Sequence, residues 1–353
     1  MAYLPPELIN EILLVLPVKS LLRFRCISKS FYAIINSKDF IYSHLHTSSQ
    51  KRIHRKLIFR CRNYNKKHYG IHALDINGSV EEILLDSVLP DNRPLFVASY
   101  NGLVLLNTTD NKLAILNPST RNYLELPAFP MNFTLVGNWK NRLGLGYDST
   151  TDDYKVLLII PAKPYCHVWI FELRSSCWRR IQDFPYIVVH KAGDGGGFVD
   201  GYMHFLCNGT REELHTIVAF DVAKETFSVV PQPSEFKGSY SKWLKVFEGC
   251  LCVQVYSPRK DDFLVDIYVW KKEGVDFTWI KLFSLLAELD NPITQGYLGY
   301  SKEGDKVLLF SFPYIYSYDL KEKSIEKIET SIVNKLDKFN YSFCLKSFVS
   351  VHS

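Results

Sequence analysis

The feature that most constrains the fold is a repeat of about fifty residues that runs through most of the chain. Each copy contains an apolar strand, a position that is often acidic or Asn, a polar turn and a second strand. In the six copies that position is occupied by Asp75, Asn117, Glu172, Asp221, Trp270 and Asp319. The successive intervals are 42, 55, 49, 49 and 49 residues, with the copies at 75 and 270 the looser ones. Hairpin units at this period are typical of β-propeller blades, since kelch blades have about 50 residues.

Six copies predict an all-β, six-bladed, kelch-like propeller. Aromatic residues, which suit pleated sheets, make up 14% of the chain and support much β structure. The C-terminal residues 341–351 alternate between apolar and polar, and we expect them to form a strand that pairs with the first blade and removes an open edge. An open or two-sheet β-sandwich with accidental spacing is the alternative fold.

The first 46 residues follow a different, helical pattern. One apolar stripe at helical spacing consists of Leu8, Ile9, Ile12, Leu13 and Leu16. Pro17 ends this helix, a second short helix follows, and Ser28 is placed to cap a third. Three short helices bury little surface, so we expect this module to need a partner to complete its core.

No motif in the sequence predicts a metal site, a cofactor or a catalytic residue. The eight Cys include no Cys-x-x-Cys pair, and the ten His include no His-Glu-x-x-His motif. The Gly-rich residues 193–197 lack the Gly-Lys-Ser/Thr ending of a phosphate loop, so we interpret them as a turn. The acidic pairs at 152–153 and 261–262 also read as turns. A propeller enzyme that assembles its site from distant loops remains an alternative.

The net charge of +5 is too small to indicate nucleic-acid binding, and none is expected. Basic residues are concentrated between Lys51 and Lys67, which we interpret as a linker and first strand, with a nuclear-import or acidic-partner patch as the alternative. The N-terminus lacks the pattern of a signal peptide, and no apolar stretch reaches membrane-spanning length. We therefore expect a cytoplasmic or nuclear protein with reduced thiols and no membrane insertion.

The N-terminal residues resemble an F-box. The resemblance rests on Leu4-Pro5-Pro6-Glu7-Leu8-Ile9, on the second Leu-Pro pair at 16–17, and on Arg25-Cys26-Ile27-Ser28-Lys29. Phe31 stands where the family often has Trp. The remaining chain is similar to the plant F-box-associated domain through Asn101-Gly102-Leu103, Asn117-Pro118-Ser119-Thr120-Arg121, Leu145-Gly146-Tyr147-Asp148, Asp152-Asp153-Tyr154-Lys155-Val156 and Trp178-Arg179.

This resemblance implies an α+β multi-domain chain. We expect a three-helix F-box at 1–46, a basic linker at 47–56 and a propeller at 57–353. The resemblance further implies a non-catalytic substrate receptor of an SCF-type cullin–RING ubiquitin ligase, which selects a protein for proteasomal degradation. Both immune-receptor-targeting and S-locus F-box proteins are similar, and residues 39–45 look more like the former.

In that family the F-box docks a SKP-type adaptor, which bridges to the cullin and RING subunits. The residues expected to contact the adaptor are Leu4, Pro5, Ile9, Ile12, Leu16, Pro17, Leu21 and Leu22. The target is unknown, and the loops proposed to select it are residues 128–141, 186–197 and 235–243. Besides the enzyme, a scaffold that holds the adaptor without meeting cullin is an alternative.

Overall fold

The structure is a computed structural model, and it divides into two compact units. The first contains Met1–Leu126 with Phe339–His352, and the second contains Pro127–Lys338. The residues that the structure describes are 5–51, 55–63, 68–75, 80–83, 95–107, 112–129, 142–162, 165–189, 197–209, 215–236, 241–260, 262–274, 276–288, 296–301, 303–311, 314–328 and 336–351.

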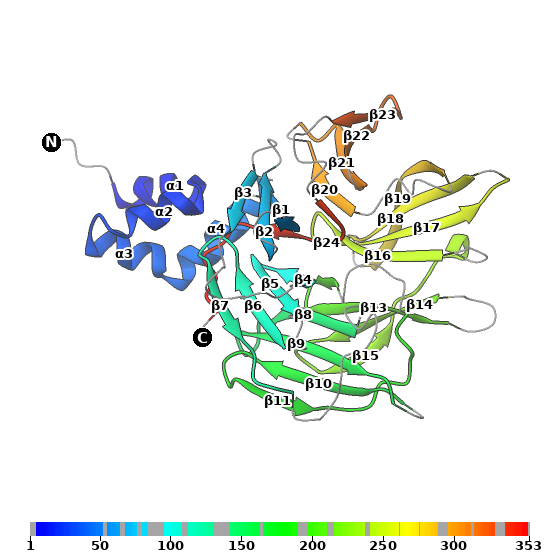
Figure 1. Cartoon of the computed structure of the whole chain (residues 1–353), viewed down its shortest axis with the longest axis horizontal. Helices are drawn as coiled ribbons and strands as arrows, with labels where there is room; N and C mark the ends of the chain where they lie inside the picture. The colour runs from blue at the N-terminus through cyan, green and yellow to red at the C-terminus, as the bar shows by residue number, and fades with distance from the viewer. Residues whose placement is uncertain are drawn as a thin grey trace. The chain divides into compact units, whose positions relative to one another are not determined.

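The N-terminal module has four helices where the sequence predicted three (Figure 1). They are α1 (Pro6–Val15), α2 (Val18–Phe24), α3 (Lys29–Asn36) and α4 (Lys38–Gln50). The predicted cap at Ser28 is present, because its hydroxyl accepts a hydrogen bond from the Phe31 amide at 3.1 Å. Ser37 repeats this arrangement with the Phe40 amide at 3.3 Å. A second capping serine therefore starts a fourth helix, which continues four residues into the range predicted as linker.

The first unit also contains two four-stranded antiparallel sheets. One combines β1 (Arg55–Asn63), β2 (His68–Asp75) and β3 (Val80–Ile83) with the C-terminal β24 (Leu336–Leu345). The other contains β4 (Leu95–Tyr100), β5 (Leu103–Asn107), β6 (Leu113–Asn117) and β7 (Asn122–Glu125).

The second unit contains four more sheets, each of four strands in chain order. The first sheet contains β8 (Leu143–Asp148), β9 (Asp153–Ile160), β10 (His167–Glu172) and β11 (Cys177–Arg180). The second contains β12 (Gly197–Val199), β13 (Tyr202–Asn208), β14 (His215–Asp221) and β15 (Thr226–Val229). The third contains β16 (Ser241–Phe247), β17 (Cys250–Pro258), β18 (Asp262–Glu273) and β19 (Asp276–Glu288). The fourth contains β20 (Gly296–Tyr300), β21 (Lys306–Ser311), β22 (Tyr314–Asp319) and β23 (Ile325–Ile328).

The prediction of six blades from six repeats needs a correction. Five sheets are blades of four consecutive strands, whereas the first copy of the repeat supplies only β1, β2 and β3. The fourth strand of that sheet is β24, which takes the place that the first strand holds in every other sheet. With β24 paired to β1, the first sheet reaches the same four strands as the other sheets. A C-terminal strand was expected to pair with this sheet over 341–351, and the pairing strand is instead Leu336–Leu345, so the prediction holds for 341–345 and is wrong for 346–351.

The repeated acidic or Asn position has one structural role. It ends the third strand of its sheet at Asp75, Asn117, Glu172, Asp221 and Asp319, whereas Trp270 lies inside β18. At Asn117, Asp221 and Asp319 the side chain organises the hairpin that follows: the Asp221 carboxylate, for example, accepts hydrogen bonds from the amides of Ala223 at 3.0 Å and Lys224 at 2.9 Å. Such bonds make Asn and Asp turn-forming residues, which explains why the repeat prefers them.

A left-handed backbone closes these hairpins. Four residues after the repeated position, φ is positive in five copies, at Arg121, Ser176, Glu225, Gly274 and Lys323. In three sheets the first hairpin is instead a two-residue turn in which both residues have positive φ: Asn101-Gly102, Asp200-Gly201 and Glu248-Gly249. These are the requirements of a type I′ turn, whose twist matches that of paired strands.

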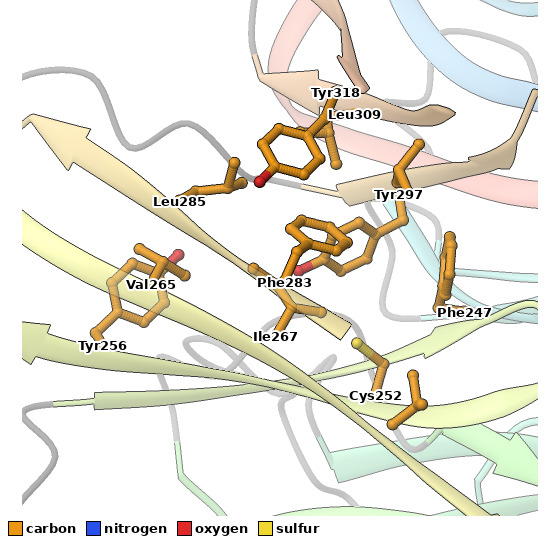
Figure 2. Close-up of a cluster of buried hydrophobic side chains, with 12 residues drawn as sticks. Phe247, Cys252, Tyr256, Val265, Ile267, Phe283, Leu285, Tyr297, Leu309 and Tyr318 are labelled. Carbon is orange, nitrogen blue, oxygen red and sulfur yellow. The ribbon is translucent and has the colours of Figure 1, made fainter. Parts of the chain in front are cut away.

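Neighbouring sheets bury their faces against one another. Figure 2 shows one such core between β16–β19 and β20–β22, where Phe283 stacks on Tyr318 at 4.8 Å between ring centroids. The fully buried Gln254 amide donates to the hydroxyl of Tyr297 at 2.5 Å, so this polar pair is satisfied within the core. The fourth strands β7, β11, β15 and β23 are largely exposed. Central strands such as β5, β6 and β9 are buried along their whole length.

A buried charge cluster joins the sheets β8–β11 and β12–β15. The Lys155 ammonium lies 2.8 Å from the Asp148 carboxylate, with side chains only 5% and 1% exposed. It also lies 3.2 Å from the Glu225 carboxylate and donates to the Val222 carbonyl at 3.1 Å. Arg179 on β11 pairs with Glu225 from the other side. Because each charge is compensated, the cluster fixes one sheet against the next at a tolerable desolvation cost.

A close approach at Gly146 on β8 completes the same junction. A Cβ atom at this position would lie 2.6 Å from Cε2 of Phe198 and 2.9 Å from Cε of Met203. Both contacts are shorter than packed carbon atoms allow. Only glycine therefore lets β8 approach β12 and β13 this closely.

Gly146→Ala should lower the free energy of unfolding by about 1–3 kcal/mol, because the added methyl group overpacks this junction. Urea unfolding followed by tryptophan fluorescence measures the change. Gly146→Ala combined with Phe198→Leu should recover part of the loss, since the smaller side chain gives room. Wild-type stability in Gly146→Ala would show that the junction is not tightly packed.

Lys155→Met should cost about 3–5 kcal/mol, because it leaves the buried Asp148 carboxylate uncompensated. The matched control is Lys224→Met, since Lys224 is 75% exposed and pairs with Asp221 at 3.5 Å. That control should cost less than about 1 kcal/mol. Equal urea midpoints for the two variants would contradict a stabilising role for the buried cluster.

The Asp148 pair also predicts a dependence on acid. Burial alone would raise the pKa of Asp148, but hydrogen bonds from Lys155 and Thr150 outweigh it and hold this pKa below its usual value. The unfolded chain then binds the proton more readily, so stability falls as pH drops below about 4, the ordinary pKa of Asp. Unfolding midpoints measured from pH 6 to pH 3 should decline more steeply for wild type than for Asp148→Asn.

Candidate functional site

The outer face of α1 carries aliphatic side chains that the protein itself leaves uncovered. Leu8 is 45% exposed, Ile12 is 50% exposed and Val15 is 40% exposed. Their spacing of four and three residues places them on one face of the helix. Isolated exposed aliphatic residues are ordinary, but a stripe of three along one helix marks a surface suited to a partner. We call these three residues the α1 outer face.

The inner face of α1 packs into the helical module. Leu13 is buried there together with Val18 and Leu21 of α2, and with Ile35 and Phe40 from α3 and α4. A sixth buried member of this cluster is Phe348, which comes from the C-terminal segment. The module was expected to need a partner for its core, and part of that core is thus supplied by the same chain.

The residues predicted to contact an adaptor occupy different environments. Leu4 lies outside the described residues. Pro5, Ile12 and Pro17 are exposed, while Ile9, Leu16 and Leu22 are half-buried. Leu21 has no exposed surface and belongs to the module core, so its side chain is not available at the surface. Only Ile12 of this set lies on the α1 outer face.

The two exposed prolines mark helix starts. Pro5 precedes α1, and its carbonyl accepts from the Ile9 amide at 3.1 Å. Pro17 precedes α2, and its carbonyl accepts from the Leu21 amide at 3.1 Å. Proline suits these places because its fixed φ is compatible with helix entry and its missing N–H is not needed there. Their positions explain the two Leu-Pro pairs of the sequence.

The sequence interpretation did not include four exposed apolar residues in the site. Leu8 and Val15 belong to the α1 outer face, and Ile27 and Tyr32 are 62% and 58% exposed. The signal for the first two was present: Leu8, Ile12 and Val15 form a stripe about 100° away from Ile9, Leu13 and Leu16. Separating the two stripes would have distinguished the docking face from the core.

Polar groups of the described residues serve mainly structural roles. No group of three or more His, Cys, Asp or Glu among them could hold a metal ion. Burial lowers the pKa of His204 to about 4, and its ring nitrogen lies 3.2 Å from the Gly197 carbonyl. Asp152 lies in a turn with positive φ, as expected, whereas Asp153 begins β9 and its carboxylate accepts the Arg174 amide at 3.0 Å. Cys166 and Cys207 are buried free thiols.

The loops predicted to select a target lie mostly outside the described residues. Of residues 128–141 the structure describes 128–129, of 186–197 it describes 186–189 and 197, and of 235–243 it describes 235–236 and 241–243. The start of the second loop is held by two backbone bridges, Cys166 to Phe184 and Val188 to Cys207. Beside them Tyr165 is 52% exposed and Ile187 is 57% exposed.

Within the part of the chain that the structure describes, none of the helices has the length and apolar character required to cross a membrane.

Comparisons with known proteins agree with this architecture. A family model described as "F-box domain" matches residues 2–43, and one described as "F-box associated beta propeller domain" matches residues 57–351. F-box protein CPR1 of Arabidopsis thaliana is 29% identical over 94% of this chain and 82% of its own length. F-box/kelch-repeat protein At3g23880 of the same plant is 27% identical over 80% of this chain and 79% of its own.

Among solved structures, TolB from Acinetobacter baumannii aligns with a TM-score of 0.49 at 9% identity, over 87% of this chain and 73% of that one. The family matches, in contrast, cover both the helical module and the sheets at high coverage. The chain therefore belongs to the F-box proteins that carry an F-box-associated β-propeller domain.

Proposed function

We propose that this chain is the substrate-recognition subunit of an SCF-type cullin–RING ubiquitin ligase. Proteins that combine an F-box with this propeller generally have that role. The observation that carries the proposal is the α1 outer face, an exposed aliphatic stripe on the matched F-box. Its occupant would be a SKP-type adaptor, which bridges to the cullin and RING subunits.

The physical basis for docking is burial of this stripe. A few residues at the centre of an interface account for most of the binding free energy, and shielding aliphatic surface from water contributes about 25 cal/mol per Å² of buried area. Pro5 and Pro17, both exposed at helix starts, would extend the contact without a large loss of conformational entropy. Leu21 would act from within the core by supporting the helices that present the surface.

The chain would contribute proximity rather than catalysis. The ubiquitin-transfer chemistry belongs to the RING subunit and its conjugating enzyme, and a receptor raises the effective concentration of target lysines near them. F-box proteins of this family are typically non-catalytic adaptors. Such a receptor needs a stable scaffold and two binding surfaces, one for the adaptor and one for the target.

Target selection would reside in the propeller loops, with the segment that begins at Tyr186 as the strongest candidate. Two backbone bridges fix its start, and the exposed Tyr165 and Ile187 beside it are suitable anchors for a protein target. We also propose an F-box module that extends to the end of α4 at Gln50, followed by a short linker and the propeller, kelch-like blades, and a location in the cytoplasm or nucleus.

Ile12→Asp should weaken binding of a SKP-type adaptor at least about thirtyfold, which corresponds to loss of a hot-spot contact of about 2 kcal/mol. Isothermal titration calorimetry with the purified adaptor measures this. The substitution should leave the free energy of unfolding within about 0.5 kcal/mol of wild type, because Ile12 is 50% exposed.

The matched control is Ile325→Asp, since Ile325 is an exposed isoleucine in β23, 38% accessible, outside the F-box. It should bind the adaptor like wild type. A folded wild-type chain that does not bind the adaptor would overturn the proposed function. Adaptor binding without cullin in the purified complex would indicate a ligase-independent scaffold instead.

A further inference from the structure

Four of the last five described residues, 347–351, are buried. After β24 ends at Leu345, Ser347 and Val351 have no exposed surface, and Phe348 and Val349 are 4% and 6% exposed. The segment lies within the first compact unit, together with the helices and two of the sheets. We call residues 347–351 the C-terminal segment.

One side of the C-terminal segment belongs to the F-box core. The Phe348 side chain packs with Leu13, Val18 and Leu21, the central residues of the helical module. The Arg25 guanidinium lies 4.8 Å from the centroid of the Phe348 ring, and the His44 ring approaches it edge-on at 5.5 Å. Burial of an aromatic ring beneath a cation contributes both apolar contact and cation–π attraction.

His44 connects this aromatic contact to α1 and α2. Its Nε2 lies 2.9 Å from the Leu16 carbonyl, at the junction between these two helices, and its ring stacks on Phe40 of the same helix α4. Phe348 therefore touches a residue that joins three of the four helices. Arg25 belongs to the sequence by which the F-box was identified.

The other side of the C-terminal segment is held by Asn117, the repeated turn residue of β6. Its amide nitrogen donates to the Val349 carbonyl at 2.8 Å and to the Ser347 carbonyl at 3.1 Å. Its oxygen accepts the Ser119 amide at 2.9 Å and thereby keeps the turn of the repeat. The Ser119 hydroxyl in turn accepts the Ser347 amide at 3.3 Å.

Asparagine is the residue type whose side chain can both accept hydrogen bonds from the turn and donate them to the C-terminal segment. Asp221 and Asp319, at the equivalent places in other sheets, accept turn amides in the same way but have no N–H group to donate. At position 117 the side chain must accept from the turn and donate to two carbonyls. The Asn-Pro-Ser-Thr-Arg sequence is thus a turn adapted to grip the C-terminal segment.

We propose that the C-terminal segment is a splint that fixes the F-box helices to the propeller sheet β4–β7, with Asn117 and Phe348 as positioning residues. The two domains are joined in sequence only at residues 51–55, between α4 and β1, and one covalent joint can hinge. The splint adds a second attachment, and β24 anchors it upstream by pairing with β1. Two attachments at different places suppress the hinge.

A fixed joint has a consequence for ubiquitin transfer that rests on the proposed function. An adaptor docked on the α1 outer face would then hold the propeller, and any target on it, in one orientation. Loss of the splint should leave the propeller folded while loosening the F-box helices. Adaptor binding would be weaker, because the adaptor must then order a loosened module.

The test uses hydrogen exchange of the full chain, monitored by mass spectrometry. Asn117→Asp keeps the turn acceptor but removes the donor and places a carboxylate against two carbonyls. Although it lies in the propeller, it should speed amide exchange in α2 and α4 at least about tenfold. Phe348→Leu, a mild change in the core, should speed the same helices. Exchange in β8–β23 should stay at the wild-type rate for both variants.

The matched control is Asp221→Asn, which keeps a turn acceptor in a sheet of the second compact unit. It should leave exchange in α2 and α4 unchanged. Exchange that rises only near the β6–β7 turn in Asn117→Asp, with α2 and α4 protected as in wild type, would overturn the splint.

Adaptor titration separates this inference from the proposed function. If wild type binds the adaptor, and Asn117→Asp binds it with about tenfold lower affinity while β8–β23 stay equally folded, both the proposed function and the splint are supported. If wild type does not bind the adaptor, but Asn117→Asp shows faster exchange in α2 and α4, the proposed function is overturned and the splint is supported. Equal affinities and equal exchange for the two proteins would remove the splint alone.

Discussion

A four-stranded sheet with two apolar faces cannot exist alone in water, and the rest of this structure follows from that constraint. An apolar sheet face must be covered, and neighbouring sheets provide this cover through cores such as the one containing Phe283 and Tyr318. The first sheet is completed from the other end of the chain, because β24 pairs with β1. Once the C-terminus is held there, the residues that follow it reach the F-box core.

The local chemistry of the repeat made much of the fold predictable. A turn residue such as Asp221 organises its own hairpin through amides two and three residues away, so its role is encoded within five residues. The helix start at Ser28 was predictable for the same reason. Ser37 carries an equal signal, but it directly follows one helix and was not recognised as the start of a fourth.

Features that depend on distant residues were not predictable in this way. The separation between Asn117 and Val349 is 232 residues, and neither position shows that its partner is the other. Leu21 and Ile12 look alike in sequence, yet one fills the module core and the other faces solvent. Burial depends on which helices pack together, and the sequence periodicity gives only the direction of each side chain. The target loops fall mostly outside the described residues, so their prediction is untested.

Sequence resemblance alone does not separate residues that hold the scaffold from residues that bind partners. Gly146, Lys155 and Arg179 belong to the sequences shared with the F-box-associated domain, and all three serve the junction between two sheets. Phe348 makes the complementary point. Because it completes the core of the helical module from within, the α1 outer face is not consumed by internal packing. A module that closed its own core by folding α1 inward would have no aliphatic stripe left for an adaptor.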